Sequence, residues 1–513
     1  MLNVGELLQT RSSGTGPAII EGATGQGVAW ADVAGQAERW SASGLAGPVG
    51  LALADPVAMA ANFVAALRSG IVVAPLDPSA PPGEHRSRIA QLGLRAMVVG
   101  PEVAPVEGVQ TWSADRRDLR LLGGDTAGGR GGNGRSLPAE PADVRAIMAS
   151  SGTTGAPKII PLTEGQLLET AAGVASHLDL DPGQRGYSPL PLFHINGLVV
   201  GVLSALVAGS TIVVDRQFSR RAFWSTVDRS GATWLNLVPA ILAILAAPLD
   251  GEGPHSWPGV RLARSASAPL PAAVRDRFEQ LTGIPVVETY GMTEAASQIT
   301  ANPTGDVRTG SVGRPVGVGL RVVDPEKRPL PAGETGQVQI RGSRVTSWYW
   351  STDPAGAGWA GRPAVDQEGW LDTGDIGWLD PDGFLYLVGR EGDVINRGGE
   401  KVQPREVEEV LLSDSRVTAA VVVGRPHPTT GEEPVAYVLA TEAAVASPQE
   451  LTADLRRLCE SSLSRFKRPA EIFVARSLPA GPTGKVRRAA VRAMPSPAPS
   501  PPESPIADST AHD

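Results

Sequence analysis

Residues 147–163 read IMASSGTTGAPKIIPLT, a run of small hydroxyl residues and glycines directly after a β-like segment. Serine, threonine and glycine are poor material for a hydrophobic core, and holding a glycine in place costs backbone entropy. The backbone amides and hydroxyls of such a loop, together with one lysine, are suited to binding phosphate oxygens. From this segment alone, a flexible surface loop is an equal alternative.

The flanks of this loop are both strand-like, over Val144–Ala149 and over the IIPL run after the lysine. Thr163–Gln166 then forms a capping box that opens an amphipathic helix. A Walker-type P-loop requires GxxxxGK[ST] running straight into a helix. Because Pro157 precedes Lys158 and Ile159 follows it, this test fails, and an ordinary P-loop NTPase is not expected.

The bulk composition limits the class of protein. With 513 residues, 42% of them hydrophobic, the chain is long enough for more than one domain. Its net charge of −8 and pI near 5.5 argue against a nucleic-acid partner, which would require clustered positive charge. Cys459 is the single cysteine, which excludes an intramolecular disulfide, and the first residues lack a signal-peptide pattern. We therefore expect a cytoplasmic location.

One apolar segment has the length of a membrane-span candidate. Gly197–Val214 comprises 18 residues without a charge. However, Gly209 and Ser210 interrupt the run, and the TIVV segment after them is β-branched. We expect a buried helix, a glycine stop and a buried strand, and no membrane partner.

The first part of the chain alternates helix-like and strand-like runs, as in the helical Pro56–Leu67 followed by the strand-like GIVVAPL. This alternation predicts an α/β fold, with a large N-terminal domain of mixed and parallel sheets flanked by helices. The texture becomes charged and glycine-rich near residue 390, where we expect a hinge to a small mobile C-terminal α/β domain. The expected boundaries are 1–389, a hinge at 390–393, a C-terminal lid at 394–494 and a disordered tail at 495–513.

Several elements are predicted within these parts. Gly123–Ser136 is a glycine-rich surface loop that need not be ordered. In the C-terminal domain, Pro404 opens a helix through Leu412, and strands are expected at Val417–Val423 and Pro434–Leu439. Ser447–Glu450 has the pattern of a capping box with proline at the first helical position.

The run SSGTTGAPK at Ser150–Lys158 closely resembles the phosphate loop of the adenylate-forming superfamily, which includes acyl-CoA synthetases, aryl-CoA ligases, luciferases and peptide-synthetase adenylation domains. Other motifs of that superfamily follow in its order. They are PLFHINGL (Pro191–Leu198), RSASAPLP (Arg264–Pro271), ETYGMTEAA (Glu288–Ala296), GSVGRPVG, GETGQVQIRG, GWLDTGDIGWLDPDGFLYLVGR and LPAGPTGKVRR. NRGGEK and TEAASQITANP look most like the oxalate–CoA ligase and fatty-acyl-CoA ligase branch.

The resemblance implies an AMP-forming acyl-CoA synthetase whose N-terminal domain binds AMP. A small-molecule carboxylic acid would attack the α-phosphorus of ATP, and coenzyme A would then displace AMP from the acyl-adenylate. ATP, Mg²⁺ and coenzyme A are the implied cofactor and co-substrates. Because the first step brings anionic oxygens together at phosphorus, it needs cations and hydrogen-bond donors already in position.

The superfamily's roles are transferred residue by residue onto the matching motifs. ATP or AMP binding is implied for Ser150, Ser151, Gly152, Thr153, Thr154, Gly155, Lys158, Ser267, Ala268, Pro269, Glu288, Thr289, Tyr290, Gly291, Met292, Thr293, Asp375 and Arg390. Coenzyme A binding is implied for Arg397, Gly398, Gly399, Glu400 and Lys401. The implied substrate pocket contains His194, Asn236, Val238, Pro239 and Met292.

Within this set, the nucleotide contacts have distinct expected roles. Asp375 would accept hydrogen bonds from the ribose hydroxyls, with Arg390 as a second ribose or phosphate contact. Tyr290 would stack on adenine, and the backbone of Ser267–Pro269 would accept from the adenine amine. Core packing of the tyrosine and a merely solvated arginine are the alternatives.

The implied catalytic residues are Lys485, Thr293, Glu294 and His194. Glu294 would bind Mg²⁺, which prefers a few carboxylate or hydroxyl oxygens beside phosphate and water. Lys485, in a PTGK turn, matches the lysine that stabilises charge at the α-phosphate. His194 matches a residue that lines the acyl pocket and gates the thiol, and at its ordinary pKa near 6.5 it would also orient a carboxylate. An exposed lysine and a packed histidine are the alternatives.

The hinge departs from the superfamily pattern. Gly392 stands two positions after Arg390, where a charged residue is usual, and glycine leaves a hinge loose. The first alternative is therefore adenylation only, with the acyl group passed to a carrier protein or a separate ligase. A non-catalytic nucleotide-binding module is the alternative of another class, although it predicts loss of Glu294 or Lys485, and both are present.

Two further activities have less support. An amino-acid adenylation domain is disfavoured, because FHIN lacks the aspartate that holds an α-amine, and luciferase activity has no positive signal. The pocket candidates are mostly apolar, which favours a hydrophobic or bulky acid over oxalate. The alanine-, glycine-, proline- and arginine-rich composition indicates a GC-rich genome and specialised metabolism. Oligomeric state is not encoded in any pattern here.

Overall fold

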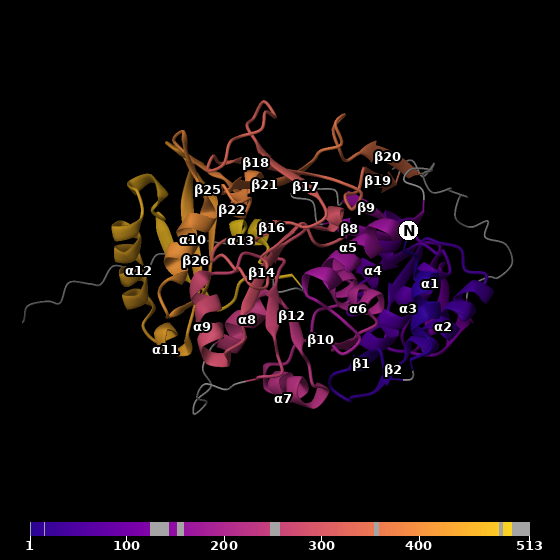
Figure 1. The fold of residues 1–513 in the computed structure, drawn as a ribbon. Coiled ribbons are helices and arrows are strands. Elements are labelled where there is room, and N and C mark those ends of the chain that lie inside the picture. The colour runs from indigo at the N-terminus through magenta and orange to yellow at the C-terminus, as the bar shows by residue number, and fades with distance from the viewer. Residues whose placement is uncertain are drawn as a thin grey trace, which may run out of the picture. The chain divides into compact units, whose positions relative to one another are not determined.

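The computed structural model describes residues 2–14, 16–123, 143–150, 158–246, 257–352, 359–481 and 486–494. The described residues form two compact units, the first over residues 2–392 together with Gly481, and the second over residues 393–480 and 486–494. Figure 1 shows the helices and strands of both. The loop predicted over Gly123–Ser136, apart from Gly123, and the predicted tail lie outside the described residues.

One sheet of the first unit runs in the order β16-β15-β14-β13-β12-β10-β11-β1-β2. Its central strands pair in parallel, from β1 through β11, β10, β12 and β13 to β14, as the βα alternation predicts. The strands are β1 Ile19–Glu21, β2 Gly27–Val28, β10 Arg185–Ser188, β11 Thr211–Val214, β12 Trp234–Leu237, β13 Leu262–Ser265, β14 Val286–Tyr290, β15 Thr300–Ala301 and β16 Arg314–Pro315.

A second sheet of this unit runs in the order β20-β19-β9-β8-β4-β3-β5-β6-β7. Its middle is parallel, whereas β8 and β9 form an antiparallel hairpin around the loop quoted above. The strands are β3 Val49–Ala52, β4 Val73–Pro75, β5 Ala96–Val99, β6 Gln110–Ala114, β7 Leu119–Gly123, β8 Val144–Ser150, β9 Lys158–Thr163, β19 Trp348–Thr352 and β20 Trp359–Pro363.

A smaller antiparallel sheet, in the order β17-β18-β21-β22, completes the first unit. Its strands are β17 Gly319–Val323, β18 Gly336–Arg341, β21 Leu371–Leu379 and β22 Leu385–Arg390. This sheet positions Asp375 opposite Arg390, because the two residues are register partners on β21 and β22.

Helices separate the strands of the first unit. They are α1 Val4–Arg11, α2 Trp30–Ala42, α3 Pro56–Arg68, α4 Pro82–Gln91, α5 Glu164–His177, η1 Asn196–Leu203, α6 Ser204–Ala208, α7 Arg220–Ser230, α8 Pro239–Ala246, α9 Ala272–Thr282, η2 Thr293–Ala295 and η3 Glu391–Asp393. The capping box predicted at Thr163–Gln166 is confirmed: the Thr163 hydroxyl accepts from Gln166 N, and the Gln166 side chain accepts from Thr163 N.

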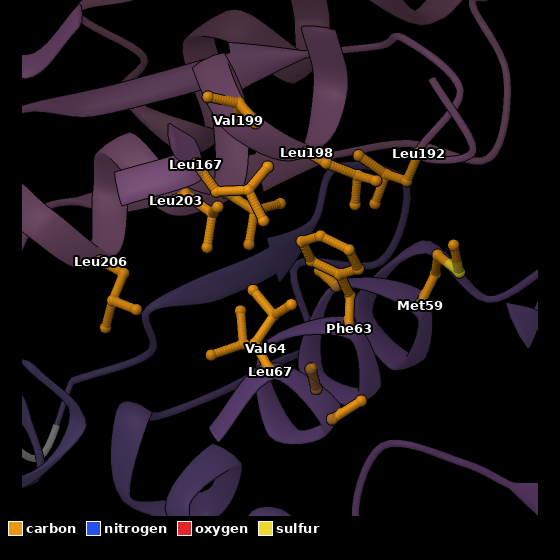
Figure 2. Close-up of a cluster of buried hydrophobic side chains, with 14 of the residues drawn as sticks. Met59, Phe63, Val64, Leu67, Leu167, Leu192, Leu198, Val199, Leu203 and Leu206 are labelled. Carbon is orange, nitrogen blue, oxygen red and sulfur yellow. The ribbon is translucent and has the colours of Figure 1, made fainter. Parts of the chain in front are cut away.

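The largest core lies between α3 and the helical segments α5, η1 and α6. Figure 2 shows side chains of α3 pointing toward those of the other three segments. The labelled residues are Met59, Phe63, Val64, Leu67, Leu167, Leu192, Leu198, Val199, Leu203 and Leu206. Burying this much aliphatic surface fixes the loop that precedes η1, which carries His194, against the body of the unit.

The uncharged segment Gly197–Val214 is buried within this unit. A helix ends at Gly209, and β11 follows, as predicted. Gly209 has a φ of +71°, a left-handed conformation that glycine adopts readily because it has no Cβ. The first part of the helix differs from an ordinary α-helix, since Asn196–Leu203 has π-helical hydrogen bonding. In the described ranges no helix is both long and apolar enough to cross a membrane.

The second unit is a compact α/β body with a sheet in the order β24-β23-β26-β25, and β27 beside β26. Its elements are β23 Ile395–Arg397, β24 Glu400–Val402, α10 Pro404–Leu412, β25 Val417–His427, β26 Gly431–Ala440, α11 Glu442–Val445, α12 Pro448–Ser462, η4 Arg465–Lys467, β27 Glu471–Val474 and α13 Arg488–Arg492. The predicted helix at Pro404–Leu412 is confirmed, and both predicted strands are longer than expected.

The capping box predicted at Ser447–Glu450 is wrong in one respect. Pro448 begins α12, but the side chain of Ser447 makes no capping hydrogen bond, because its backbone (φ −132°, ψ 65°) departs from the extended geometry of an N-cap. Leu451, Leu455 and Cys459 form the buried face of α12, and the thiol is free and buried.

Candidate active site

The end of the quoted loop is anchored by a β-hairpin. Ser150 and Lys158 are register partners on β8 and β9, so the segment between them connects two paired strands. The predicted phosphate contacts Ser151, Gly152, Thr153, Thr154 and Gly155 lie outside the described residues, as does the side chain of Ser150. The ammonium of Lys158 lies 4.8 Å from the centre of the Tyr349 ring, and the Arg362 guanidinium lies 4.7 Å from it.

Tyr349 also contacts Glu294, the predicted metal ligand. Its hydroxyl donates to Glu294 Oε1 at 3.2 Å, and Glu294 is 7% exposed. Burial and the nearby Glu294 carboxylate raise the pKa of Tyr349, so the hydroxyl stays protonated and donates. Glu294 lies in η2, and its backbone carbonyl oxygen accepts a hydrogen bond from Thr346 N at 2.7 Å. Lys158 and Glu294 therefore both lie beside Tyr349, although they come from distant segments.

Asp375, Tyr290 and Arg390 form a second cluster. The Tyr290 hydroxyl donates to Asp375 Oδ2 at 2.5 Å, and Arg390 Nε donates to Asp375 Oδ1 at 2.8 Å. Burial, with the Asp375 charge, raises the pKa of Tyr290 well above its ordinary value. The predicted nucleotide residues Asp375, Tyr290 and Arg390 are thus brought together, with both carboxylate oxygens of Asp375 oriented.

The predicted adenine-side residues flank the end of β14. Ser267 has a φ of +76°, a strained conformation for a side-chain-bearing residue, and its hydroxyl accepts from Asn196 Nδ2 at 3.3 Å. Ala268 is half-buried and Pro269 exposed, whereas Glu288 and Thr289 are buried. The Thr289 hydroxyl donates to the carbonyl of Ser265.

Gly291 and its neighbours Met292 and Thr293 form the tight turn after β14. A Cβ on Gly291 would lie 1.4 Å from the carbonyl oxygen of Ser297, so only glycine fits. Met292 packs against the cluster that contains Tyr290, and Thr293 opens η2. The turn that Gly291 allows therefore sets the position of Glu294 relative to the end of β14.

His194 lies in the loop before η1 and is mostly buried. Burial lowers its pKa to about 4, although the charge of Asp77 opposes the shift. The imidazole is therefore neutral at neutral pH, which corrects the expectation of an ordinary pKa near 6.5. Its Nε2 atom is buried without a hydrogen-bond partner in the part of the chain that the structure describes, so this nitrogen is left for a ligand.

The predicted pocket residues divide into two groups. Asn236, the penultimate residue of β12, is fully buried and donates to the Ser188 hydroxyl and to Asn196 Oδ1. Val238 packs in the core cluster with α8, and Pro239 begins that helix. Met292 instead belongs to the Tyr290 cluster.

In the second unit, the predicted coenzyme A residues form one hairpin. Arg397 ends β23, Glu400 and Lys401 begin β24, and Gly398 and Gly399 make the turn with φ values of +63° and +95°. Arg397 Nη1 donates to the carbonyls of Phe466 and Arg468. Lys485 lies outside the described residues. Gly392 ends the first unit, and a Cβ there would meet no atom within 4 Å.

Sequence reasoning missed two residues of this site. Tyr349 lies in an aromatic WYW run that has no spacing relation to Glu294, and only the pairing of Trp350 with Ile159 in the sheet brings it there. Arg264 was treated as part of a loop motif, yet it is a fully buried cation bonded to Asn196 and Asn236. The available signal was an arginine that directly follows the apolar pair of Leu262 and Ala263.

The AMP-binding enzyme model matches residues 17–350, and the AMP-binding enzyme C-terminal domain model matches residues 406–485. This chain belongs to the AMP-binding enzyme family. The resemblance to adenylate-forming enzymes is thereby confirmed.

Curated relatives of this AMP-binding enzyme carry coenzyme A ligase names. Sulfoacetate–CoA ligase of Cupriavidus necator is 42% identical over 68% of this chain and 67% of its own length. Oxalate–CoA ligase of Arabidopsis thaliana is 36% identical over 68% and 67%. 4-Coumarate–CoA ligase 1 of Oryza sativa subsp. japonica is 30% identical over 93% and 89%. The expected enzyme class, an AMP-forming acid–thiol ligase, is confirmed.

Solved structures agree with this fold and class. The o-succinylbenzoate CoA synthetase of Bacillus subtilis, in complex with its acyl-adenylate intermediate, matches with a TM-score of 0.77 and 26% identity over 95% of this chain and 97% of that one. Another structure of the B. subtilis enzyme holds ATP and a magnesium ion. These findings support ATP-dependent acid activation through an acyl-adenylate and transfer to coenzyme A by this AMP-binding enzyme.

Proposed function

We propose that this AMP-binding enzyme holds ATP with its ribose at Asp375 and its phosphates between Lys158 and Glu294, while His194 orients the carboxylate of a small acid. The contacts of Lys158 with the Tyr349 ring and of Glu294 with the Tyr349 hydroxyl carry this proposal. They join the end of the phosphate loop to the acidic residue of the MTEA motif. A cation and a carboxylate are then available within one small region.

Asp375 is suited to the ribose because its orientation is already fixed. Tyr290 and Arg390 each donate one hydrogen bond to it, one to each carboxylate oxygen. A carboxylate has about four lone-pair positions, so acceptor capacity is left for the two ribose hydroxyls. The Tyr290 ring packs in a buried cluster with Ala295 and Ile299, so adenine stacking on this ring stays a prediction.

Glu294 fits a Mg²⁺ site. The carboxylate is buried and receives one hydrogen bond from Tyr349, which leaves lone pairs for a hard cation. Bound Mg²⁺ would neutralise charge on the phosphates of ATP. With a single protein carboxylate, phosphate oxygens and water supply the other ligands. The described residues contain no cluster of three or more metal-ligating side chains, which fits such a shared site.

In the first step, a carboxylate oxygen of the acid forms a bond to the α-phosphorus, and the bond from that phosphorus to the bridging oxygen breaks as pyrophosphate leaves. His194 is neutral, so it orients the carboxylate through one hydrogen bond without forming an ion pair that would reduce its nucleophilicity. We assign Lys485 to stabilising the charge at the α-phosphate.

In the second step, the sulfur of coenzyme A forms a bond to the acyl carbon, AMP leaves with the former carboxylate oxygen, and the thiol proton passes to solvent. The glycine turn at Gly398 and Gly399 allows backbone to approach the pantetheine arm closely. Transfer to a carrier protein or a separate ligase is the second candidate, motivated by Gly392.

Purified protein incubated with ATP, Mg²⁺ and a panel of aliphatic, aromatic and polycyclic acids tests these assignments. We expect pyrophosphate release without coenzyme A, and acyl-CoA with it.

Glu294→Gln is expected to lower the adenylation rate by roughly a hundredfold, because the metal loses its carboxylate. Glu326→Gln, an exposed carboxylate paired with Arg328, is the matched control. Acyl-AMP that accumulates in the presence of coenzyme A would favour the carrier alternative, and an unaffected Glu294→Gln would contradict the metal site.

A further inference from the structure

Arg264 is a buried cation whose described hydrogen-bond partners are all neutral. It lies on β13 and is 1% exposed. Nη1 donates to Asn196 Oδ1 at 3.2 Å and to Asn236 Oδ1 at 3.1 Å, and Nη2 donates to Gln298 Oε1 at 3.3 Å. These partners are amide oxygens. Over the described ranges, no carboxylate acts on the charge of Arg264, whose pKa is shifted by burial alone.

The positive charge persists at neutral pH, because burial lowers the pKa of Arg264 only to about 9. A buried charge without a counter-charge is costly, since amide dipoles replace only part of its hydration. Around it, Arg264 Nε, Gln298 Nε2 and Ser265 Oγ are buried without hydrogen-bond partners among the described residues. The region therefore has one unneutralised cation and unused donors, the combination that an anion satisfies.

This cation belongs to the predicted acid pocket. Asn196, which it contacts, follows His194 by two residues and donates to the Ser267 hydroxyl of the adenine-side loop. Asn236, its other partner, is one of the predicted pocket residues and is its register partner across β12 and β13. Both strands are parallel, and Arg264 and Asn236 are their penultimate residues. The carboxyl edge of parallel strands is where α/β folds bind their ligands.

We propose that Arg264 binds a second anionic group of the acid, at the end remote from the carboxylate that is adenylated. The substrate class is then small dianionic acids, either dicarboxylic or sulfo-carboxylic. This assignment rests on the proposed function. This substrate class replaces the hydrophobic or bulky acid expected from the sequence. That expectation came from mostly apolar pocket candidates, which did not include the charged Arg264. Arg264 is on this view a substrate-contacting specificity residue.

Matched acid pairs test the proposal. Pyrophosphate release gives kcat/KM for malonate against propanoate, succinate against butanoate, and sulfoacetate against acetate. In the unaltered enzyme, at least one dianionic member is expected to be preferred by roughly a hundredfold over its partner, the scale of a buried charge pair. Arg264→Met is expected to abolish that ratio chiefly through KM, and Arg264→Lys to retain part of it.

Arg261→Met is the control, because Arg261 is exposed and its side chain donates to the carbonyl of Leu178, outside the predicted acid pocket. It is expected to keep the dianion preference. Thermal unfolding of each variant separates loss of folding from loss of selectivity. The kcat/KM ratio of each acid pair in the unaltered enzyme tests the proposal even if a variant fails to fold. Arg264→Met that lowers both members of a pair equally would show that Arg264 only holds Asn196 and Asn236, which overturns the proposal.

The two levels of inference fail differently. Monoacids activated as well as their dianionic partners by the unaltered enzyme would overturn the assignment of Arg264 and leave the ligase function standing. Failure to activate any acid, whatever its charge, would contradict the proposed function itself.

Discussion

The imidazole of His194 is held neutral by burial rather than by a partner. Its ring is tilted against that of Phe193, with 4.6 Å between the ring centres, and Nε2 meets no protein donor or acceptor within the described ranges. A charged imidazole would lose hydration there, so the pKa falls to about 4 even though Asp77 opposes the shift. The neutral form persists across the pH range in which the enzyme is expected to work.

This shift predicts a pH-dependent stability. The unfolded chain titrates His194 near 6.5 and the folded one near 4, so between these values the unfolded state binds more protons and stability is lost as pH falls. The contribution is about 2 kcal/mol between pH 7 and pH 5. Urea unfolding at both pH values, with His194→Gln as comparison, measures it. An equal loss in the variant, or an imidazole NMR signal titrating near 6.5, would contradict it.

At this scale the sequence located some residues and missed others. Glu294, Asp375 and Tyr290 sit in contiguous motifs, so their spacing alone placed them. Tyr349 and Arg264 act through partners that only sheet pairing supplies, and a motif scan has no access to such pairings. The burial of His194 likewise depends on packing around η1, which the FHIN motif does not encode.

Among elements, the turn between β14 and η2 has the tightest steric requirement of the site. Ser297, with a φ of +109°, directs its carbonyl at Gly291, and Ser297 N in turn donates to the carbonyl of Met292. The backbone of this turn therefore cannot shift easily to accommodate a larger side chain. It sets the direction in which Glu294 leaves the sheet.

Gly291→Ala is expected to lower the free energy of unfolding by more than about 2 kcal/mol, because the new Cβ would overlap the Ser297 carbonyl oxygen. Thermal or urea unfolding measures the effect. Gly305→Ala is the matched control: a Cβ at Gly305 meets no atom within 4 Å, and a change within about 0.5 kcal/mol is expected. Equal stability of the two variants would contradict this account.

Local patterns predicted elements well where side chains and backbone agree. The Thr163 capping box starts α5 as expected, because Thr163 is extended and its hydroxyl faces the free amides. The same pattern at Ser447 failed, because the backbone there takes a different ψ and Pro448 alone suffices to start the helix. The π-helical start of Asn196–Leu203 was also unpredictable, since apolar runs carry no signal for hydrogen-bond register.

At the scale of the whole molecule, the boundary between the two units falls at Gly392. Glycine is not required there by space, since a Cβ would meet no atom within 4 Å, nor by a left-handed φ. We expect this residue to act as a hinge, because glycine leaves the backbone free at a position where the local geometry does not require it.

Gly392→Asp is expected to leave the adenylation rate within about threefold, because no residue assigned to the nucleotide or the metal is altered, and to raise the fraction of acyl-adenylate converted to thioester by restricting the backbone at this position. Product analysis by chromatography, with and without coenzyme A, measures both. Gly392→Ala separates the effect of restriction from that of charge. A thioester fraction unchanged in both variants would show that hinge freedom does not limit the transfer step.

The only thiol of this polypeptide is enclosed in α12 of the second unit, where burial raises its pKa to about 11. A thiol-specific reagent therefore has one site of reaction, and that site is inaccessible while the second unit stays folded. Without any introduced label, the rate of modification of Cys459 therefore measures transient opening of the second unit. Ligands that stabilise the second unit against opening would slow this reaction.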